Sequence, residues 1–196
     1  MSRYRTRSWR AFDPAALARP ASVSVSVRVL GLDPGSRRTG FGVIDCCRGE
    51  LAVVTHGCLN VSGTSPAARL RVIFEGLQAL VSEHHPHEVA IERVFVSRNA
   101  DSALKLGQER GAALCAVPPA VPVFEYAPRA VKLAVVGSGG AEKFQVAHMI
   151  RVLLALRDSP GADASDALAV AVCHAHARRY GAPAQQPTAR ARHFAR

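Results

Sequence analysis

Residues 23–45 read VSVSVRVLGLDPGSRRTGFGVID, and this stretch decides the architecture. An alternating run becomes fully apolar before Asp33, the turn-forming residues PGSRRTG follow, and the apolar run FGVID comes next. This pattern predicts two strands joined by a tight turn. The run LAVVTHGCLN at 51–60 supplies a third strand, so we expect the domain to open with an antiparallel meander.

Beyond this meander, helical and strand-like segments alternate. Ser65 and Pro66 form an N-cap and a first helical position, and apolar residues then recur at helical spacing until Pro86. Two short buried strands are predicted, VAIE at 89–92 and VPVFEY at 121–126. Further helices are expected through 103–117, from Pro128 and from near Asp163. Another is expected through the apolar positions Phe144, Ala147, Ile150 and Leu154. This order predicts an α/β fold in which helices flank a mixed five-stranded sheet, with three antiparallel strands followed by parallel ones.

The size and composition of the chain limit the possible classes of protein. The chain has 196 residues, of which 48% are hydrophobic and 20% are charged, which suits one compact domain. A collagenous, coiled-coil or wholly disordered protein is excluded. No apolar run reaches the roughly 18 residues that a membrane span requires, so we expect a soluble protein without a membrane partner.

The formal charge of +10 is concentrated at the two ends of the chain. Residues 1–28 carry six Arg against Asp13, residues 178–196 carry five Arg and no acid, and residues 29–177 hold 14 basic and 14 acidic residues. The central domain is therefore neutral overall. Basic ends of this kind either hold phosphate backbones or are solvated, disordered segments.

These boundaries divide the chain into three parts. We expect a basic, disordered extension at 1–26, a folded domain at 27–178 and a basic, disordered tail at 179–196. The first residues contain no apolar segment of the kind that a secretory signal requires. Five cysteines without a CxxC pair favour neither a disulfide framework nor a zinc site, and they indicate a reducing, cytoplasmic compartment.

Four acidic residues occupy positions from which a sheet and a helix could bring them together. Asp33 closes the first apolar strand and Glu92 ends the strand VAIE, and ligand sites in α/β sheets favour the carboxyl ends of strands. Asp163 and Asp166 stand three apart at the start of the last helix, so they share one face. Turn formation or helix capping would account for some of these acids separately.

Capping and turns explain the two strand-end acids poorly, because a charge beside Val, Ile and Leu is costly unless it is paired. Divalent cations would offset this cost. Ligand oxygens without His or Cys suit magnesium or manganese rather than zinc. Two such ions roughly 4 Å apart would stabilise the attacking and leaving oxygens of phosphodiester hydrolysis. By contrast, His174 and His176 stand two apart on a helix, do not share a face and suggest no site.

Several long strings in this sequence resemble the bacterial RuvC family of Holliday-junction resolvases. They are LGLDPGSRRTGFGVI, AIE at 90–92 with Phe95, NADSALKLGQERG at 99–111, VFEYAPRAVKLAVVGSGGAEKFQVAHM at 123–149 and DASDALAVA at 163–171. The resemblance covers about residues 29–177. It implies an RNase H-like fold and a homodimer that makes paired symmetric nicks in four-way DNA junctions during recombination and repair.

The resemblance also implies roles for the four acids and a set of partners. Asp33, Glu92, Asp163 and Asp166 fall on the catalytic, metal-binding acids of the family, which hold two Mg²⁺ per active site and accept Mn²⁺ as a substitute. A branch-migration complex of the RuvA and RuvB type is the implied protein partner. The Arg-rich extension and the basic tail have no counterpart in this pattern, so we assign them no role.

Candidate DNA contacts lie near these acids. From the sequence alone, Phe95 in the polar loop RVFVSRN is favoured as a loop anchor, whereas the resemblance implies that it stacks on an unpaired base. The candidates for holding phosphates are Arg98, Lys105, Arg129, Lys132 and Lys143. In the family, the positions that match Lys132 and Lys143 lie near the junction.

Two other functions remain open at this point. The hairpin DPGSRRTGFGV also resembles the phosphate-binding hairpin of actin-like ATPases and sugar kinases, although those proteins need a second related domain around the nucleotide. Alternatively, the chain is a junction-binding module without chemistry. Such a module would bind junctions with an outcome that neither magnesium nor Asp33→Asn alters.

Overall fold

The computed structural model describes residues 26–93 and 100–181. The elements are β1 (Val27–Asp33), β2 (Arg38–Cys47), β3 (Glu50–Asn60), α1 (Pro66–His84), β4 (Glu88–Glu92), α2 (Ala100–Cys115), β5 (Val123–Tyr126), α3 (Pro128–Val136), α4 (Lys143–Leu153) and α5 (Ala162–Tyr180). The strands form one five-stranded sheet of order β3-β2-β1-β4-β5. The pairs β1–β2 and β2–β3 are antiparallel, and β1–β4 and β4–β5 are parallel. The predicted mixed sheet is therefore confirmed.

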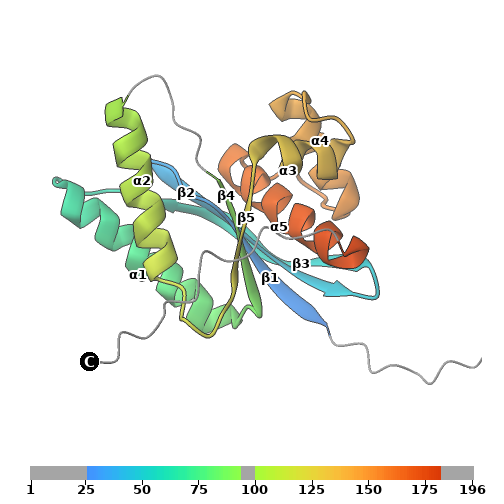
Figure 1. The fold of residues 1–196 in the computed structure, drawn as a ribbon, viewed down its shortest axis with the longest axis horizontal. Coiled ribbons are helices and arrows are strands. Elements are labelled where there is room, and N and C mark those ends of the chain that lie inside the picture. Colours follow the sequence, from blue (N-terminus) through green and yellow to red (C-terminus); the bar gives the residue numbers. More distant parts are fainter. Residues whose placement is uncertain (1–25, 94–99, 182–196) are drawn as a thin grey trace, which may run out of the picture.

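Helices cover both faces of the sheet. Figure 1 shows α1 and α2 together on one side, with α3, α4 and α5 on the other. Residues of β1 alternate between the two layers, as strand geometry requires. Leu30 and Leu32 pack in the core beneath α1 and α2, whereas Val29 packs in the core beneath α5. Asp33 and Glu92 are therefore carried by the central strands β1 and β4, whose middle residues are buried, whereas alternate residues of the edge strand β3 are exposed.

Helix α1 has the local signals that the sequence predicts. The side chain of Ser65 accepts a hydrogen bond from the backbone N–H of Ala68 at 3.2 Å, and Pro66 occupies the first turn. A cap of this kind stabilises a helix by about 1 kcal/mol. Ile73 and Leu77, one turn apart, are fully buried against the sheet. The predicted helix and its N-terminus are confirmed.

Helix α5 lies unusually close to the centre of the sheet because two glycines carry no side chain there. A Cβ atom on Gly40 of β2 would lie 2.0 Å from the carbonyl oxygen of Asp163. On Gly31 of β1 it would lie 2.2 Å from the carbonyl oxygen of Ala167. Glycine permits backbones to approach this closely. The contact fixes the first turns of α5 beside the carboxyl end of β1.

The structure differs from the sequence prediction in two local features. Phe144 was placed on the apolar face of its helix but is 73% exposed, because the buried face of α4 passes instead through Val146 and Ile150. Helix α5 continues to Tyr180, and Gly181, which has a left-handed conformation, caps it. Arg179 is therefore helical rather than part of the tail.

Among the helices of residues 26–93 and 100–181, none has both the length and the apolar character that a membrane span needs.

Candidate active site

A cavity of about 300 Å³ lies where β1 and β4 end beneath helices α3, α4 and α5. It is lined by Asp33, Glu92, Asp166, Lys132 and Lys143, together with Pro128, Val131, Val146 and Ala169. Strands β1 and β4 are parallel, and Leu32 pairs with Ile91, so Asp33 and Glu92 follow that pair at the same edge of the sheet. The close seating of α5 then brings Asp166 to this edge.

The carboxylates in this cavity are close enough to disturb one another. Burial raises the pKa of Asp33 to about 7, and the negative charges of Glu92 and Asp166 contribute to the rise. Burial also raises the pKa of Glu92, with a further contribution from Asp166. A cluster of this kind disfavours full ionisation unless positive charge is added.

Two lysines supply part of that positive charge. Nζ of Lys143 donates a hydrogen bond to Oδ2 of Asp166 at 3.1 Å, and this contact raises the pKa of Lys143. The charges of Lys143 and Lys132 both oppose the rise in the pKa of Glu92. The cavity therefore combines carboxylates that can bind a cation with ammonium groups that can bind a phosphate.

Asp163 lies at the rim rather than among the residues that line the cavity. Its Oδ2 atom is 3.7 Å from a guanidinium nitrogen of Arg38, and both side chains are partly exposed. An exposed pair at this distance contributes little stability. The charge of Asp163 nevertheless contributes to the raised pKa of Asp33. The structure thus brings three of the four predicted acids into one cavity and places the fourth nearby.

The donor atoms in this cavity suit a hard divalent cation. Carboxylate oxygens are the ligands that Mg²⁺ and Mn²⁺ prefer, and a bound cation would relieve the repulsion that raises the pKa of Asp33. Within residues 26–93 and 100–181, no three acidic, His or Cys side chains are already gathered closely enough to hold an ion. The chemistry of the site fits a cation, and Asp33, Glu92 and Asp166 are the cavity residues that would hold it.

Of the remaining predicted DNA contacts, the two that the structure describes are not among the residues that line the cavity. Arg129 is exposed on α3. Lys105 is exposed on α2 and forms an ion pair with Asp101, one turn earlier, at 2.7 Å. Phe95 and Arg98 lie outside the described residues. Among the cationic candidates within the described ranges, Lys132 and Lys143 therefore share the cavity with the acids.

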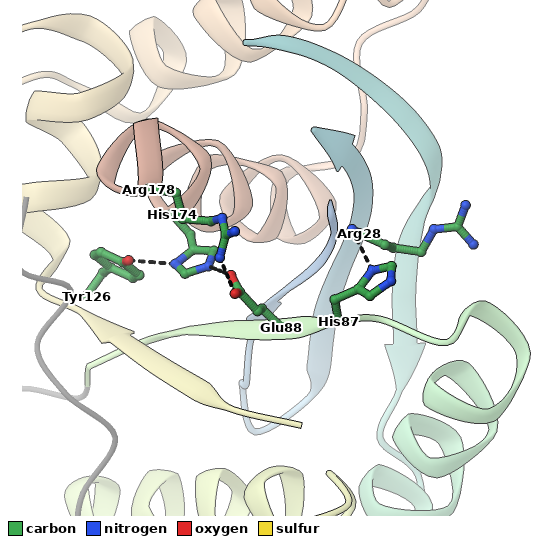
Figure 2. A network of polar contacts seen from close by, with 6 residues as sticks. All are labelled: Arg28, His87, Glu88, Tyr126, His174 and Arg178. Carbon is green, nitrogen blue, oxygen red and sulfur yellow. Dashed lines mark hydrogen bonds and ion pairs between the residues drawn. The ribbon is translucent and has the colours of Figure 1, made fainter. Parts of the chain in front are cut away.

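Sequence reasoning missed a buried polar network at the opposite end of α5 (Figure 2). The hydroxyl of Tyr126 lies 2.6 Å from Nδ1 of His174, and Nε2 of His174 lies 2.5 Å from Glu88. Arg178 forms an ion pair with the other oxygen of Glu88. Burial lowers the pKa of His174. A neutral ring then accepts from Tyr126 and donates to Glu88.

One signal in the sequence could have located this network. Glu88 and Glu92 are four residues apart on β4, so both face the α5 layer. The prediction began the strand at Val89 and thereby left Glu88 outside it. Reading Glu88 as the first strand residue would have shown two acids on one face, one at each end of the strand.

Comparisons with known proteins agree with this geometry. The family model for crossover junction endodeoxyribonuclease RuvC matches residues 29–174. The chain belongs to the RuvC family. The RuvC of Halorhodospira halophila is 56% identical over 153 residues, which cover 77% of this chain and 91% of that protein.

Solved RuvC structures have the same fold. The Thermus thermophilus RuvC structure is 32% identical, with a TM-score of 0.71, covering 79% of this chain and 97% of that chain. The T. thermophilus RuvC in complex with Holliday junction substrate is also 32% identical, with a TM-score of 0.70 and coverage of 79% and 96%. The RNase H-like arrangement expected from the sequence is therefore the observed RuvC fold.

Proposed function

We propose that this chain is a metal-dependent endonuclease that resolves four-way DNA junctions by paired symmetric nicks in recombination and repair. One observation carries the proposal: Asp33, Glu92 and Asp166, from three different elements, line one cavity with two lysines in a chain of the RuvC family. Support for the substrate comes from a RuvC relative whose structure contains a Holliday junction.

The acids would hold two Mg²⁺ ions, with Mn²⁺ as a substitute. Asp33, Glu92 and Asp166 would be ligands from the cavity, and Asp163 would join them from the rim. Bound ions of this kind supply an activated water and stabilise the departing 3′ oxygen, which leaves 5′-phosphate and 3′-hydroxyl ends. Lys132 and Lys143 would hold the phosphate over the acids and offset its charge.

The remaining assignments concern the assembly. Paired nicks in opposing strands require two active sites, so the working form would be a homodimer. We assign further DNA contacts to Phe95, Arg98, Lys105 and Arg129, and a branch-migration complex of the RuvA and RuvB type is the proposed partner. The compartment would be the bacterial cytoplasm, where junction DNA is found.

Cleavage of a labelled four-way junction tests the function. We expect wild-type protein to make paired nicks with Mg²⁺ and none with EDTA. Asp33→Asn and Glu92→Gln should lower cleavage at least 100-fold while junction binding stays within about 3-fold, because each removes a charged ligand without removing the cavity. Glu75→Gln, which changes an exposed acid on α1, is the matched control and should cleave normally.

The alternatives predict different results in the same assay. A phosphate-binding ATPase would hydrolyse ATP and leave the junction intact. A binding module without chemistry would bind the junction without cutting it. Neither Mg²⁺ nor Asp33→Asn would alter that outcome. Wild-type protein that cleaves no junction sequence with any divalent ion would overturn the proposal.

A further inference from the structure

The end of β4 that carries Glu92 is held by an arginine from the opposite face of the sheet. Arg110 on α2 donates a hydrogen bond from one terminal nitrogen to the backbone carbonyl oxygen of Glu92 at 2.9 Å. Its other terminal nitrogen lies 2.6 Å from a carboxylate oxygen of Glu125 on β5. The two side chains are only 12% and 19% exposed. One guanidinium group therefore ties the ends of two neighbouring strands together.

The backbone position of Glu92 depends on a contact of this kind more than the backbone position of Asp33 does. Asp33 is still within the antiparallel ladder, where it pairs with Gly40. The parallel ladder between β1 and β4 ends at Leu32 and Ile91, one residue before Glu92. Glu92 pairs with Tyr126 on the other side, at the last register position of β5. The strand end that presents the Glu92 carboxylate is thus held on one side by β5, where the backbone N–H of Arg93 also donates to the carbonyl oxygen of Tyr126 at 2.7 Å, and from the α2 layer by Arg110.

We infer that Arg110 is a positioning residue for the active site, which fixes the Glu92 carboxylate by holding its backbone carbonyl while Glu125 holds the guanidinium in place. The inference rests on the proposed function, since it assigns Arg110 a task only if Glu92 is a metal ligand. Arg110 is not among the described residues that line the cavity. It acts through the main chain of β4, from the layer formed by α1 and α2.

The chemistry of this contact requires arginine. The guanidinium is a rigid, planar fork that can donate to a carbonyl and to a carboxylate at once. A lysine has one nitrogen on a flexible stem, so it would keep the charge but not span both acceptors. Displacement of a catalytic group by about 1 Å can lower a rate about 100-fold. Arg110→Lys should therefore disturb the site more than it disturbs the fold.

The chain offers a matched control for this substitution. Arg28, at the start of β1, donates to both carboxylate oxygens of Asp45 at 2.8 Å and to the backbone carbonyl oxygen of His84 at 3.0 Å. It has the same kind of contacts as Arg110 but lies at the end of β1 opposite Asp33. Arg28→Lys therefore reports what loss of such a clamp does to the fold alone.

The experiment compares both variants in cleavage, binding and metal response. We expect Arg110→Lys to lower kcat 10- to 100-fold at saturating Mg²⁺, with junction affinity in EDTA within 2-fold of wild type. Arg28→Lys should lower Tm by a similar amount and keep kcat within 2-fold. Without DNA, the Mg²⁺ concentration that gives half of the metal-induced rise in Tm should increase at least 5-fold for Arg110→Lys only.

Two further variants keep the result interpretable. In a Glu92→Gln background, Arg110→Lys should cause no additional change in the Mg²⁺ response, because it acts through Glu92. Glu125→Gln, a milder change, should shift the response in the same direction if Arg110→Lys does not fold. Equal effects of Arg110→Lys and Arg28→Lys on kcat and Mg²⁺ response would overturn the inference. Failure of wild-type protein to cleave would instead overturn the proposed function.

Discussion

Asp33 meets two conflicting requirements in the folded protein. Its proposed role as a metal ligand calls for an ionised carboxylate, yet burial and the neighbouring acids raise the pKa of Asp33 to about 7. The unfolded chain releases this proton near pH 4. Between these two values the native state binds more protons, so the ionisation of Asp33 costs stability as the pH rises from about 4 to 7.

Replacement of Asp33 should therefore stabilise the metal-free protein while it abolishes cleavage. We expect Asp33→Asn to raise the free energy of unfolding in EDTA at pH 8 by about 2–4 kcal/mol, since each unit of pKa shift corresponds to about 1.4 kcal/mol. The gain should shrink toward pH 4. Urea unfolding at several pH values measures it, and a less stable variant at pH 8 would contradict the explanation.

The acids could be predicted from the sequence because their positions follow from element boundaries. Asp33 and Glu92 end apolar strands, and Asp166 lies in the first turns of a helix. The contact between Lys143 and Asp166 could not be predicted, since it depends on how α4 and α5 pack. The same holds for Arg110, which reaches the site from another layer.

Among the elements, α5 depends most on its approach to the sheet. Gly40→Ala would place a methyl group 2.0 Å from the backbone oxygen of Asp163, and a backbone cannot yield as a flexible side chain can. We expect a loss of roughly 1–3 kcal/mol in the free energy of unfolding and a more than 10-fold drop in cleavage, because α5 must shift together with Asp166.

Gly107→Ala on α2 is the control for this prediction. A Cβ atom at Gly107 meets nothing within 4 Å, so alanine should leave stability unchanged or raise it by about 0.5–1 kcal/mol. Thermal unfolding and junction cleavage measure both variants. If Gly40→Ala behaves like Gly107→Ala, the close contact does not determine the position of α5.

The network around His174 ties the far end of α5 to the sheet. Tyr126→Phe removes the hydroxyl that donates to Nδ1 of His174 and leaves a buried acceptor without its partner. We expect a loss of about 1–3 kcal/mol at pH 7.5, measured by urea unfolding. Junction cleavage per folded molecule should be unchanged, because the lost hydroxyl lies against His174 and is not among the groups that line the cavity, and the main chain of Tyr126 keeps its pairing with Glu92.

Element prediction succeeded where periodicity was strong and failed at element ends. The alternating run before Asp33 and the helical spacing after Ser65 both gave the observed elements. Phe144 was misplaced because a first-turn residue follows the helical period without reaching the core. The tail was predicted to begin at Arg179, inside α5, because the last turn of that helix is rich in Arg and resembles a tail in composition.

At the scale of the whole molecule, the net positive charge lies at the two ends of the chain and not in the middle of the domain that carries the four acids. Residues 29–177 are neutral overall, and the net charge lies in the two ends of the chain. The segment 182–196, outside the described residues, contains Arg190, Arg192 and Arg196. The net positive charge therefore lies at and beyond the two edges of the domain proposed from the sequence, and its interior is neutral overall.

Removal of residues 182–196 tests whether the tail contacts DNA. If its three arginines bind phosphates, the slope of log affinity against log salt should decrease by up to about 2.7, at about 0.9 per phosphate. Cleavage should persist, because the acids and both cavity lysines remain. Fluorescence anisotropy with a labelled junction in increasing KCl measures the slope, and an unaltered slope would exclude a phosphate-binding tail.

The direct contact of α5 with Gly31 and Gly40 implies that these two positions tolerate less substitution than the rest of the core. At Gly31 and Gly40 the nearest atoms of α5 are main-chain oxygens, which any residue at those helix positions would carry, whereas Gly42 of β2 meets the side chain of Leu168. Aliphatic residues elsewhere in the interior can then be exchanged over long divergence without moving the aspartates relative to one another. Glycine at positions 31 and 40, rather than a particular set of core residues, would then preserve the arrangement of the acids.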